Sequence, residues 1–501
     1  MKMNIDMNRL FLPLFLLIIL GSCSGQATDT ENAATTTEGC VDQEHAAELK
    51  ARLENGMRGK VKFIGEAERL NSIADKMSEY TIPAISLAVI REGQIEWSET
   101  YQNTEVGENQ KLDCTSLFQA ASLSKPVTFM AAVRMHAAGE IDLDKNIEDY
   151  LKSFQLPQGK QTVGNPVTFR NIFSHTSGIN AGGYQGYNRS LDMPSDLDIL
   201  MGNDGVNSPA IEVVWEPNET LAYSGGGYTL AELALQDIYG ATFSEIMKKW
   251  ILRPANMENS EFTQPLPASD SNRVAKGHTH SAEALEGGWR NHPEQAAAGL
   301  WSNAVDLARF MTEIYDAYQG NPSIFSQSDI ESIIRDERDG HVYGFIVNRT
   351  ENDLALTHYG GNAGYRTAMT ISLTTGNGLV YLINSDNGGN LGNELLLSAA
   401  QVYGWKHFPQ TQAHRKKIDT DTLKALEGAY KWNDQVDLNI RYDEKEELIV
   451  LIFPNGDAYK LVPVVGGELD FVHPNTGIEV AFLQEDNFNS FSLYGQKALR
   501  Q

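Results

Sequence analysis

The most informative segment of this chain is Phe118-Gln119-Ala120-Ala121-Ser122-Leu123-Ser124-Lys125. Ser122 stands three residues before Lys125, and side chains at this spacing lie on one face of a helix. The lysine nitrogen can then reach the serine hydroxyl, which is the layout of an acyl-transferring serine with its own base. Pro126 predicts that a helix begins here, because proline is tolerated in a first turn and breaks a helix further in.

The residues after the proline extend this helix. Residues 127–135 are mostly apolar and predict a buried helix that stops at Gly139. Ser122 would then lie at the helix N-terminus, where backbone N–H groups stabilise a developing negative charge. The Ser-x-x-Lys spacing alone is weak, because roughly two occurrences are expected by chance in a chain of this length. A helix start with a solvated lysine explains an isolated one equally well.

Two further motifs supply what such a serine needs. The first is Leu221-Ala222-Tyr223-Ser224-Gly225-Gly226-Gly227-Tyr228, in which a tyrosine precedes a glycine-rich turn that leads into a helix. The second is Thr357-His358-Tyr359-Gly360-Gly361-Asn362-Ala363-Gly364-Tyr365, which places a histidine and glycines that permit close approach at the edge of a predicted strand.

Together with the serine segment, these motifs resemble the class C β-lactamase, D-alanyl-D-alanine peptidase and family VIII esterase group of serine hydrolases. The resemblance spans roughly residues 50–405 in consistent order, and it is greatest to bacterial members with a lipocalin-like C-terminal domain. It implies an α/β fold of the β-lactamase/transpeptidase type, with an antiparallel sheet flanked by helices and a helical subdomain. A small all-β domain is expected to follow.

The resemblance also implies residue roles. Ser122 matches the acylated nucleophile, Lys125 its adjacent base, and Tyr223 the tyrosine that shuttles protons. The backbone N–H groups of Ser122 and Gly361 match the oxyanion hole, whose donors stabilise the charge that develops in the transition state. The substrate-binding positions are His358, Gly360, Asn362 and Arg366, with His358-x-Gly360 standing where relatives have Lys-Thr-Gly.

Two departures from the family bear on the substrate. The Tyr-x-Asn motif of the family is Tyr223-Ser224-Gly225 here, so the amide that would hold a substrate's acylamino group is absent. His358 replaces a lysine and, at an ordinary pKa near 6.5, would become charged only as the pH falls towards 6. Arg366 could supply the missing positive charge.

These departures favour an esterase or amidase acting on small or peptide-like substrates. The alternatives are a true β-lactamase or D-alanyl-D-alanine carboxypeptidase and, from another class, a non-catalytic protein that binds cell-wall peptides or β-lactams. A pure binder does not need Ser122, Lys125 and Tyr223 together. Two other motifs are set aside: Ser385-Asp386-Asn387 predicts a turn after a strand, and His175 a loop-orienting residue.

The N-terminus indicates export. Lys2 and Arg9 flank an apolar run over 10–20 that is too short to span a bilayer and suits a signal peptide. It ends in Leu20-Gly21-Ser22-Cys23, which resembles a lipoprotein cleavage site and makes Cys23 the expected lipid-bearing residue. The alternative is an ordinary secretion signal with an incidental cysteine, and in both cases the mature protein works outside the cytoplasm. With the anchor, we expect a bacterial cell-envelope protein that contacts the membrane only through its lipid.

Composition excludes several classes of partner. The formal net charge of −26 argues against nucleic acid or an anionic membrane surface. Cys40 and Cys114 could form a disulfide or remain free thiols, and the sequence leaves both open. No cysteine pair has zinc-finger spacing, and His278-x-His280 has no third ligand nearby, so neither metal nor cofactor is expected.

The chain organisation follows from hydrophobic patterning. Residues 41–80 predict helices, 82–90 and 95–101 a hairpin, and 368–373 and 379–383 returning strands of the same sheet. The expected segments are a signal peptide over 1–22, a tether over 23–45, the hydrolase-like domain over 46–405, a linker over 406–422 and a β-barrel or sandwich over 423–501.

Overall fold

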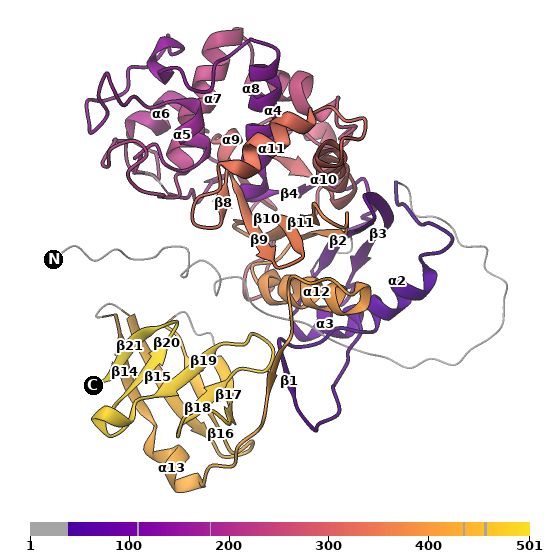
Figure 1. Cartoon of the computed structure of the whole chain (residues 1–501), viewed down its shortest axis with the longest axis vertical. Helices are drawn as coiled ribbons and strands as arrows, with labels where there is room; N and C mark the ends of the chain where they lie inside the picture. Colours follow the sequence, from indigo (N-terminus) through magenta and orange to yellow (C-terminus); the bar gives the residue numbers. More distant parts are fainter. Residues whose placement is uncertain (1–38, 108–109, 181, 434–435, 455–457) are drawn as a thin grey trace.

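The protein is described by a computed structural model that covers residues 39–107, 110–180, 182–433, 436–454 and 458–501. It consists of a large α/β part and a smaller β-barrel (Figure 1). The expected lipidation site Cys23 and the expected signal peptide lie outside the described residues. Within these residues, no helix is both long and apolar enough to cross a membrane.

Within the described part of the chain, seven strands form one antiparallel sheet in the order β3-β2-β12-β11-β10-β9-β8. Their bounds are β2 Ala84–Arg91, β3 Gln94–Gln102, β8 His341–Val342, β9 Phe345–Thr350, β10 Asp353–Asn362, β11 Tyr365–Ser372 and β12 Gly378–Ile383. The early hairpin joins the later strands where β2 pairs with β12, with Ala88 opposite Val380. The predicted sheet, built from both ends of the domain, is confirmed.

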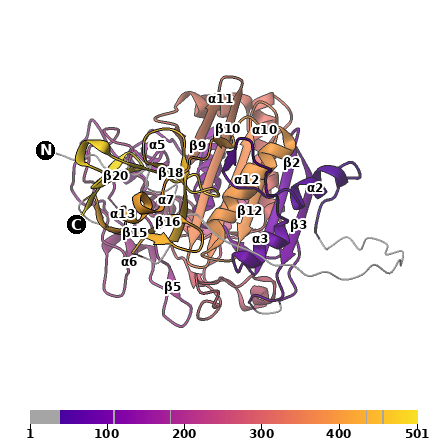
Figure 2. The same cartoon turned by 90° about the horizontal axis from the view of Figure 1, so that it is seen from below.

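Alternating side chains give the sheet two buried faces. Leu87 and Val89 pack with α12 (Gly388–Tyr403) on one face, and Ala88 and Ile90 pack with α10 (Ala304–Gln319) on the other. Figure 2 shows α12 and α3 lying over the first of these faces. Because both faces are covered, the central strands β2 and β12 are nearly continuous buried apolar runs, whereas edge strand β3 alternates with polar residues.

A helical part covers the α10 side of the sheet (Figure 1). Its helices are α4 Ser124–Ala137, α5 Phe169–Phe173, α6 Asp196–Met201, α7 Gly225–Tyr239, α8 Phe243–Met247, α9 Gln295–Ala298 and α11 Gln327–Arg335, with short helical turns η1 Ala121–Leu123, η2 Ile147–Asp149, η3 Lys248–Leu252 and η4 Ala268–Arg273. Two small ladders join its loops, β4 (Phe118–Gln119) with β7 (Trp301–Ser302) and β5 (Tyr187–Asn188) with β6 (Arg290–Asn291).

Two segments differ from the sequence-based expectation. Residues 41–80 contain helices α2 (Ala47–Glu54) and α3 (Ile73–Glu79), but strand β1 (Val61–Phe63) lies between them. The expected linker contains strand β13 (Thr411–Ala413), which pairs in parallel with β1. Each strand is only three residues long and pairs only with the other within the described residues, so neither has a hydrophobic pattern long enough to be recognised in the sequence.

The C-terminal residues form a closed β-barrel, as one of the two predicted forms. Its described strands are β14 Gly428–Trp432, β15 Val436–Asp443, β16 Leu448–Ile452, β17 Ala458–Val464, β18 Asp470–Val472, β19 Glu479–Phe482, β20 Ser490–Leu493 and β21 Gln496–Arg500, preceded by helix α13 (Thr420–Ala425) and with a turn η5 at Gln484–Asp486. Pairing of β14 with β21 closes the ring. Its interior is filled by apolar side chains that include Tyr430, Phe482 and Phe491. The likeness to lipocalins stays a prediction.

The barrel docks on the side of the sheet that carries α3 and α12 (Figure 1). Backbone N–H groups of Lys60 and Val61 donate to the carbonyl oxygens of Asn475 and Pro474 at 3.0 and 2.9 Å. The Asn475 amide donates to the hydroxyl of Tyr80 at 3.4 Å. The barrel therefore contacts the face of the α/β part opposite to the helical part.

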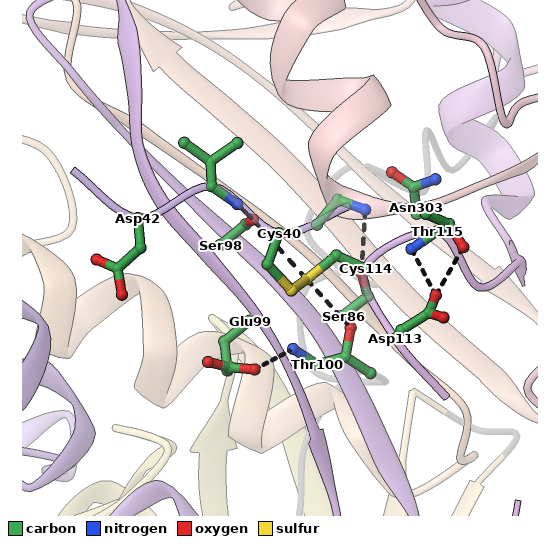
Figure 3. Close-up of a disulfide and its surroundings, with 12 residues drawn as sticks. Cys40, Asp42, Ser86, Ser98, Glu99, Thr100, Asp113, Cys114, Thr115 and Asn303 are labelled. Carbon is green, nitrogen blue, oxygen red and sulfur yellow. Dashed lines mark hydrogen bonds between the residues drawn. A yellow bond between two sulfur atoms is a disulfide. The ribbon is translucent and has the colours of Figure 1, made fainter. Parts of the chain in front are cut away.

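A disulfide joins Cys40 to Cys114 across a sequence separation of 74 residues. Figure 3 shows it beside Ser98 and Thr100 of edge strand β3. The adjoining backbone is held to β3 as well, since the Ser98 N–H donates to the Val41 carbonyl at 2.7 Å. Of the two states that the sequence left open, the structure has the bridge.

Removing this disulfide should cost substantial stability. A cross-link limits the freedom of the unfolded chain, and for a loop closed over 74 residues the expected loss is about 4 kcal/mol. We expect Cys40→Ser/Cys114→Ser to lower the free energy of unfolding in urea by about that amount relative to the oxidised protein. Addition of dithiothreitol should destabilise the native chain and leave the double variant unchanged. A loss below about 1 kcal/mol would contradict this.

Candidate active site

Ser122 lies in a helical turn that leads into a helix. The turn η1 spans Ala121–Leu123, and α4 begins at Ser124, so Ser122 precedes the helix instead of starting it. Ala121 has φ +52°, a left-handed conformation that is uncommon for a residue with a side chain. The Ser124 hydroxyl holds this bend, because it donates to the Ala121 carbonyl at 2.6 Å and accepts from the Leu300 N–H at 3.0 Å.

Two proton-bearing side chains meet at the Ser122 hydroxyl. The Lys125 Nζ lies 3.3 Å from the Ser122 Oγ, and the Tyr223 hydroxyl donates to the same oxygen at 3.0 Å. Lys125 is only 2% exposed, and its Nζ also donates to the Ala297 carbonyl at 2.7 Å. It lies 4.8 Å from the centre of the Tyr223 ring. Ser122 and Tyr223 are half-buried, so the serine can be reached from solvent while its lysine cannot.

Strand β10 passes unusually close to the turn that carries Ser122. A Cβ at Gly360 would lie 2.6 Å from the Ala120 carbonyl oxygen, which no real side chain tolerates. The Thr367 hydroxyl of the neighbouring strand donates to that same carbonyl at 2.9 Å. Next along β10, Gly361 is exposed. The strand edge therefore presents an accessible backbone beside Ser122, where the sequence placed the second oxyanion donor.

His358 is a buried, neutral imidazole. It is 7% exposed, and its Nδ1 has no hydrogen-bond partner among the described residues. Burial, reinforced by the nearby charge of Lys125, lowers the pKa of His358 to about 3. The expectation that it becomes charged near pH 6 is wrong, because an imidazole at this depth loses the solvation that its cation needs.

Asn362 and Arg366 are directed into the protein. The Asn362 amide donates to the Gln119 side chain at 2.9 Å and to the Ala298 carbonyl at 3.2 Å. The Arg366 guanidinium pairs with Asp386 at 2.9 Å, so its charge is compensated. These contacts hold the end of the strand in place, and the expected part of both residues in substrate binding stays a prediction.

The position that lacks the family's amide is closed in this protein. A Cβ at Gly225 would lie 2.6 Å from the Gly182 carbonyl and 2.9 Å from Cε2 of Tyr184. The Tyr184 hydroxyl is in turn bonded to Thr229 Oγ1 at 3.0 Å. An aromatic ring thus fills the space that a side chain at position 225 would need. Tyr184 could not be found from the sequence, since no motif signals that its ring packs against Gly225.

Ser385-Asp386-Asn387 and His175, which the sequence did not assign to the site, have structural roles. Ser385 follows β12, and its hydroxyl accepts from the Asn387 N–H at 3.1 Å, so the turn after the strand is confirmed. His175 orients a loop, as predicted, and its Nδ1 accepts the Ser224 N–H at 3.1 Å. No three His, Cys, Asp or Glu side chains within the described ranges are grouped to hold a metal ion.

This arrangement can perform acyl transfer. A hydroxyl that contacts both an amine and a phenol can lose its proton while it attacks a carbonyl carbon. Backbone N–H groups beside it can stabilise the resulting oxyanion.

Comparison with known proteins gives a consistent result. The sequence model described as Beta-lactamase matches residues 70–403. Penicillin-binding protein 4* of Bacillus subtilis (strain 168) is 23% identical over 433 residues, which span 80% of this chain and 90% of that protein.

Solved structures share the fold. The octameric penicillin-binding protein homologue from Pyrococcus abyssi superposes with a TM-score of 0.55 at 19% identity, covering 84% of this chain and 97% of that one. The crystal structure of SurE gives a TM-score of 0.51 at 19% identity, covering 84% and 96%. Because the family match extends over more than half of the sequence, this chain belongs to the Beta-lactamase family of serine hydrolases, which act through an acyl-enzyme.

Proposed function

We propose that Ser122 is the nucleophile of an esterase or amidase that acts on small or peptide-like substrates. The observation that carries this proposal is the contact of one half-buried hydroxyl with both Lys125, at 3.3 Å, and Tyr223, at 3.0 Å. The Ser122 oxygen attacks the substrate carbonyl carbon while its proton passes to the lysine or the tyrosine. The N–H groups of Ser122 and Gly361 hold the oxyanion.

The remaining steps return the enzyme to its starting state. The tetrahedral intermediate expels an alcohol or amine, which takes up the proton, and leaves an ester on Ser122. Water then attacks this ester, with Lys125 or Tyr223 receiving the proton of the water molecule. The products are a carboxylic acid and the free serine, and the overall reaction consumes one water molecule.

The surroundings support esters or simple amides over β-lactams and D-alanyl-D-alanine peptides, which carry a carboxylate. The His358 imidazole is neutral, because its pKa lies at about 3, and the Arg366 charge is paired with Asp386. The space next to Gly225 is filled by Tyr184, so an acylamino group finds no amide there. Each missing hydrogen bond weakens substrate binding by about 1 kcal/mol.

We also propose that the protein works outside the cytoplasm, attached through Cys23. The Cys40–Cys114 disulfide supports an oxidising compartment, where such bonds persist. Retention of the protein in a membrane fraction, lost on Cys23→Ala, would test the anchor.

Ser122→Ala should abolish labelling by a fluorophosphonate and turnover of esters, since it removes the hydroxyl that contacts both Lys125 and Tyr223. Ser124→Ala is the matched control, and it should keep much of the labelling and turnover, because it leaves Ser122, Lys125 and Tyr223 in place although the bend before Ser122 loses one hydrogen bond. It should nevertheless lower the free energy of unfolding by about 1–3 kcal/mol, because the buried Leu300 N–H loses its acceptor. Labelling that persists in Ser122→Ala would refute the assignment. A fluorescent penicillin used in parallel separates ester-like from β-lactam-like reactivity.

The substrate preference should not depend on the state of His358. With a pKa of about 3, its imidazole stays neutral from pH 6 to pH 8 and gains no attraction for a carboxylate as the pH falls. We expect a higher kcat/KM for p-nitrophenyl butyrate than for nitrocefin, with a ratio constant within about twofold over this range. His358→Lys, which restores a cation, should narrow the gap. A ratio that falls steadily towards pH 6 in the native enzyme would overturn this expectation.

A further inference from the structure

The backbone on both sides of Tyr223 is bonded to a single residue, His175. The Ala222 N–H donates to the His175 carbonyl at 2.7 Å, and the Ser224 N–H donates to the His175 Nδ1 at 3.1 Å. The imidazole also lies against the Tyr223 ring, with centroids 4.4 Å apart and planes tilted by 33°. One residue thus restrains the tyrosine through its two neighbours and its ring.

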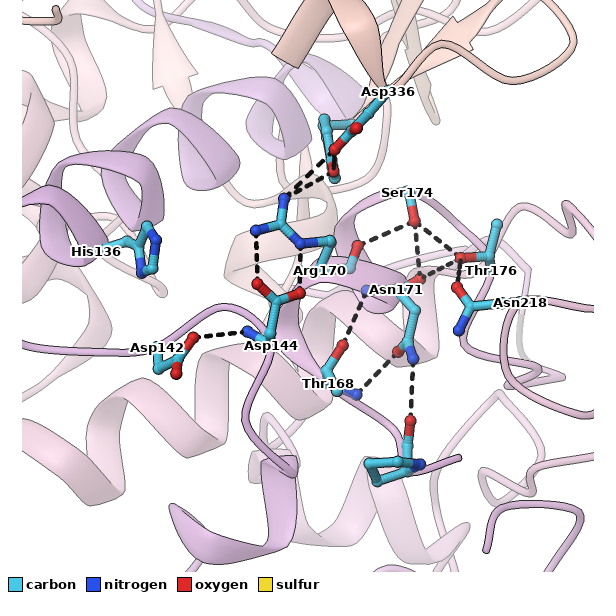
Figure 4. A network of polar contacts seen from close by, with 12 residues as sticks. His136, Asp142, Asp144, Thr168, Arg170, Asn171, Ser174, Thr176, Asn218 and Asp336 are labelled. Atoms are coloured by element: carbon cyan, nitrogen blue, oxygen red, sulfur yellow. Dashed lines mark hydrogen bonds and ion pairs between the residues drawn. The ribbon is translucent and has the colours of Figure 1, made fainter. Parts of the chain in front are cut away.

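His175 is itself held in a strained conformation. Its φ is +56°, in the left-handed region that costs energy for residues other than glycine, although histidine and asparagine enter it more readily than most. The residues on either side of His175 are labelled in Figure 4, where Thr176 is bonded to Ser174 at 2.8 Å and to Asn218 at 3.3 Å. The Asn218 N–H closes the turn by donating to the Thr176 carbonyl at 2.7 Å.

The protonation state of His175 allows its Nδ1 to accept a hydrogen bond. Its Nδ1 accepts a hydrogen bond, so that nitrogen carries no proton. Burial lowers the pKa of His175 well below its ordinary value, and the nearby Lys125 and the histidines His358 and His341 act in the same direction. The imidazole is therefore neutral at neutral pH, and its Nδ1 is able to accept the Ser224 N–H.

We propose that His175 is a positioning residue for Tyr223, which holds the phenol oxygen in reach of Ser122. The proposal rests on the role of Tyr223 given above. His175 bonds to the backbone of residues 222 and 224, and its ring lies against the rings of Tyr223 and Tyr228, so none of these contacts is with the Ser122 hydroxyl. Its effect on the reaction passes through the orientation of Tyr223, and small displacements of a catalytic group slow a chemical step strongly.

Three substitutions separate the parts of this restraint. His175→Asn keeps an acceptor close to the Nδ1 position and tolerates the left-handed backbone, but it removes the ring. His175→Phe keeps a ring and removes the acceptor, and His175→Ala removes both. We expect the alanine and phenylalanine variants to lose roughly 10- to 100-fold in kcat on p-nitrophenyl butyrate with KM nearly unchanged. The asparagine variant should recover most of that loss.

Stability is measured on the same samples. Ile246→Ala removes buried side-chain volume from α8 and should cost about 2–5 kcal/mol while leaving kcat intact. This control separates loss of positioning from general destabilisation. If the alanine variant does not fold, His175→Asn and His175→Gln carry the same comparison, since the longer glutamine places its oxygen beyond the Ser224 N–H.

The outcomes distinguish this proposal from the proposed function. If the native enzyme shows neither ester turnover nor fluorophosphonate labelling of Ser122, the proposed function fails. If the native enzyme is active and a folded His175→Ala or His175→Phe variant keeps native kcat, the positioning role is wrong. An asparagine variant that is no better than phenylalanine would also overturn it, since the acceptor would then be irrelevant.

Discussion

The close crossing of β10 over the turn before Ser122 is the constraint on which the site depends. At Gly360 a Cβ would lie 2.6 Å from the Ala120 carbonyl, so strand and turn can approach this closely only without a side chain. The crossing brings together residues more than two hundred positions apart in the sequence, and it sets the exposed backbone of Gly361 near the turn that carries the serine. Thr367 of the neighbouring strand stabilises this approach, because its hydroxyl donates to the Ala120 carbonyl. The sheet to which β10 belongs is packed on both faces.

Much of the architecture could be predicted from the sequence because its signals are local. The β2–β3 hairpin is marked by an apolar run, a turn and an alternating strand, and α4 by a proline in its first turn. The spacing of Ser122 and Lys125 anticipates their 3.3 Å contact, since three residues of helical backbone suffice to create it. Tyr223 required the resemblance to a known family, because its contact with Ser122 spans 101 positions of sequence.

What the sequence could not predict depends on contacts between distant segments. Strands β1 and β13 are visible only as a pair. The Arg366 charge is compensated by Asp386, and the His358 pKa is set by burial, so neither residue's electrical state follows from its type. Tyr184 and His175 act through Gly225 and Tyr223, to which no periodicity links them. In each case the sequence gives the residue type, but the charge, pKa or packing of the residue depends on a neighbour that is distant in the sequence.

The disulfide also determines the path by which a mechanical force applied from the N-terminal side enters the protein. Residues 41–43 lie along edge strand β3, held by backbone hydrogen bonds such as that from the Gln43 N–H to the Glu96 carbonyl. Such bonds at a sheet edge break one after another when the end of a strand is peeled away. Cys40 precedes all of them in the sequence and is joined covalently to Cys114. Three residues after Cys114, the Leu117 N–H donates a hydrogen bond to the Arg273 carbonyl at 2.7 Å. Force applied ahead of Cys40 therefore passes into the α/β part through the disulfide. The hydrogen bonds between residues 41–43 and edge strand β3 carry less of it.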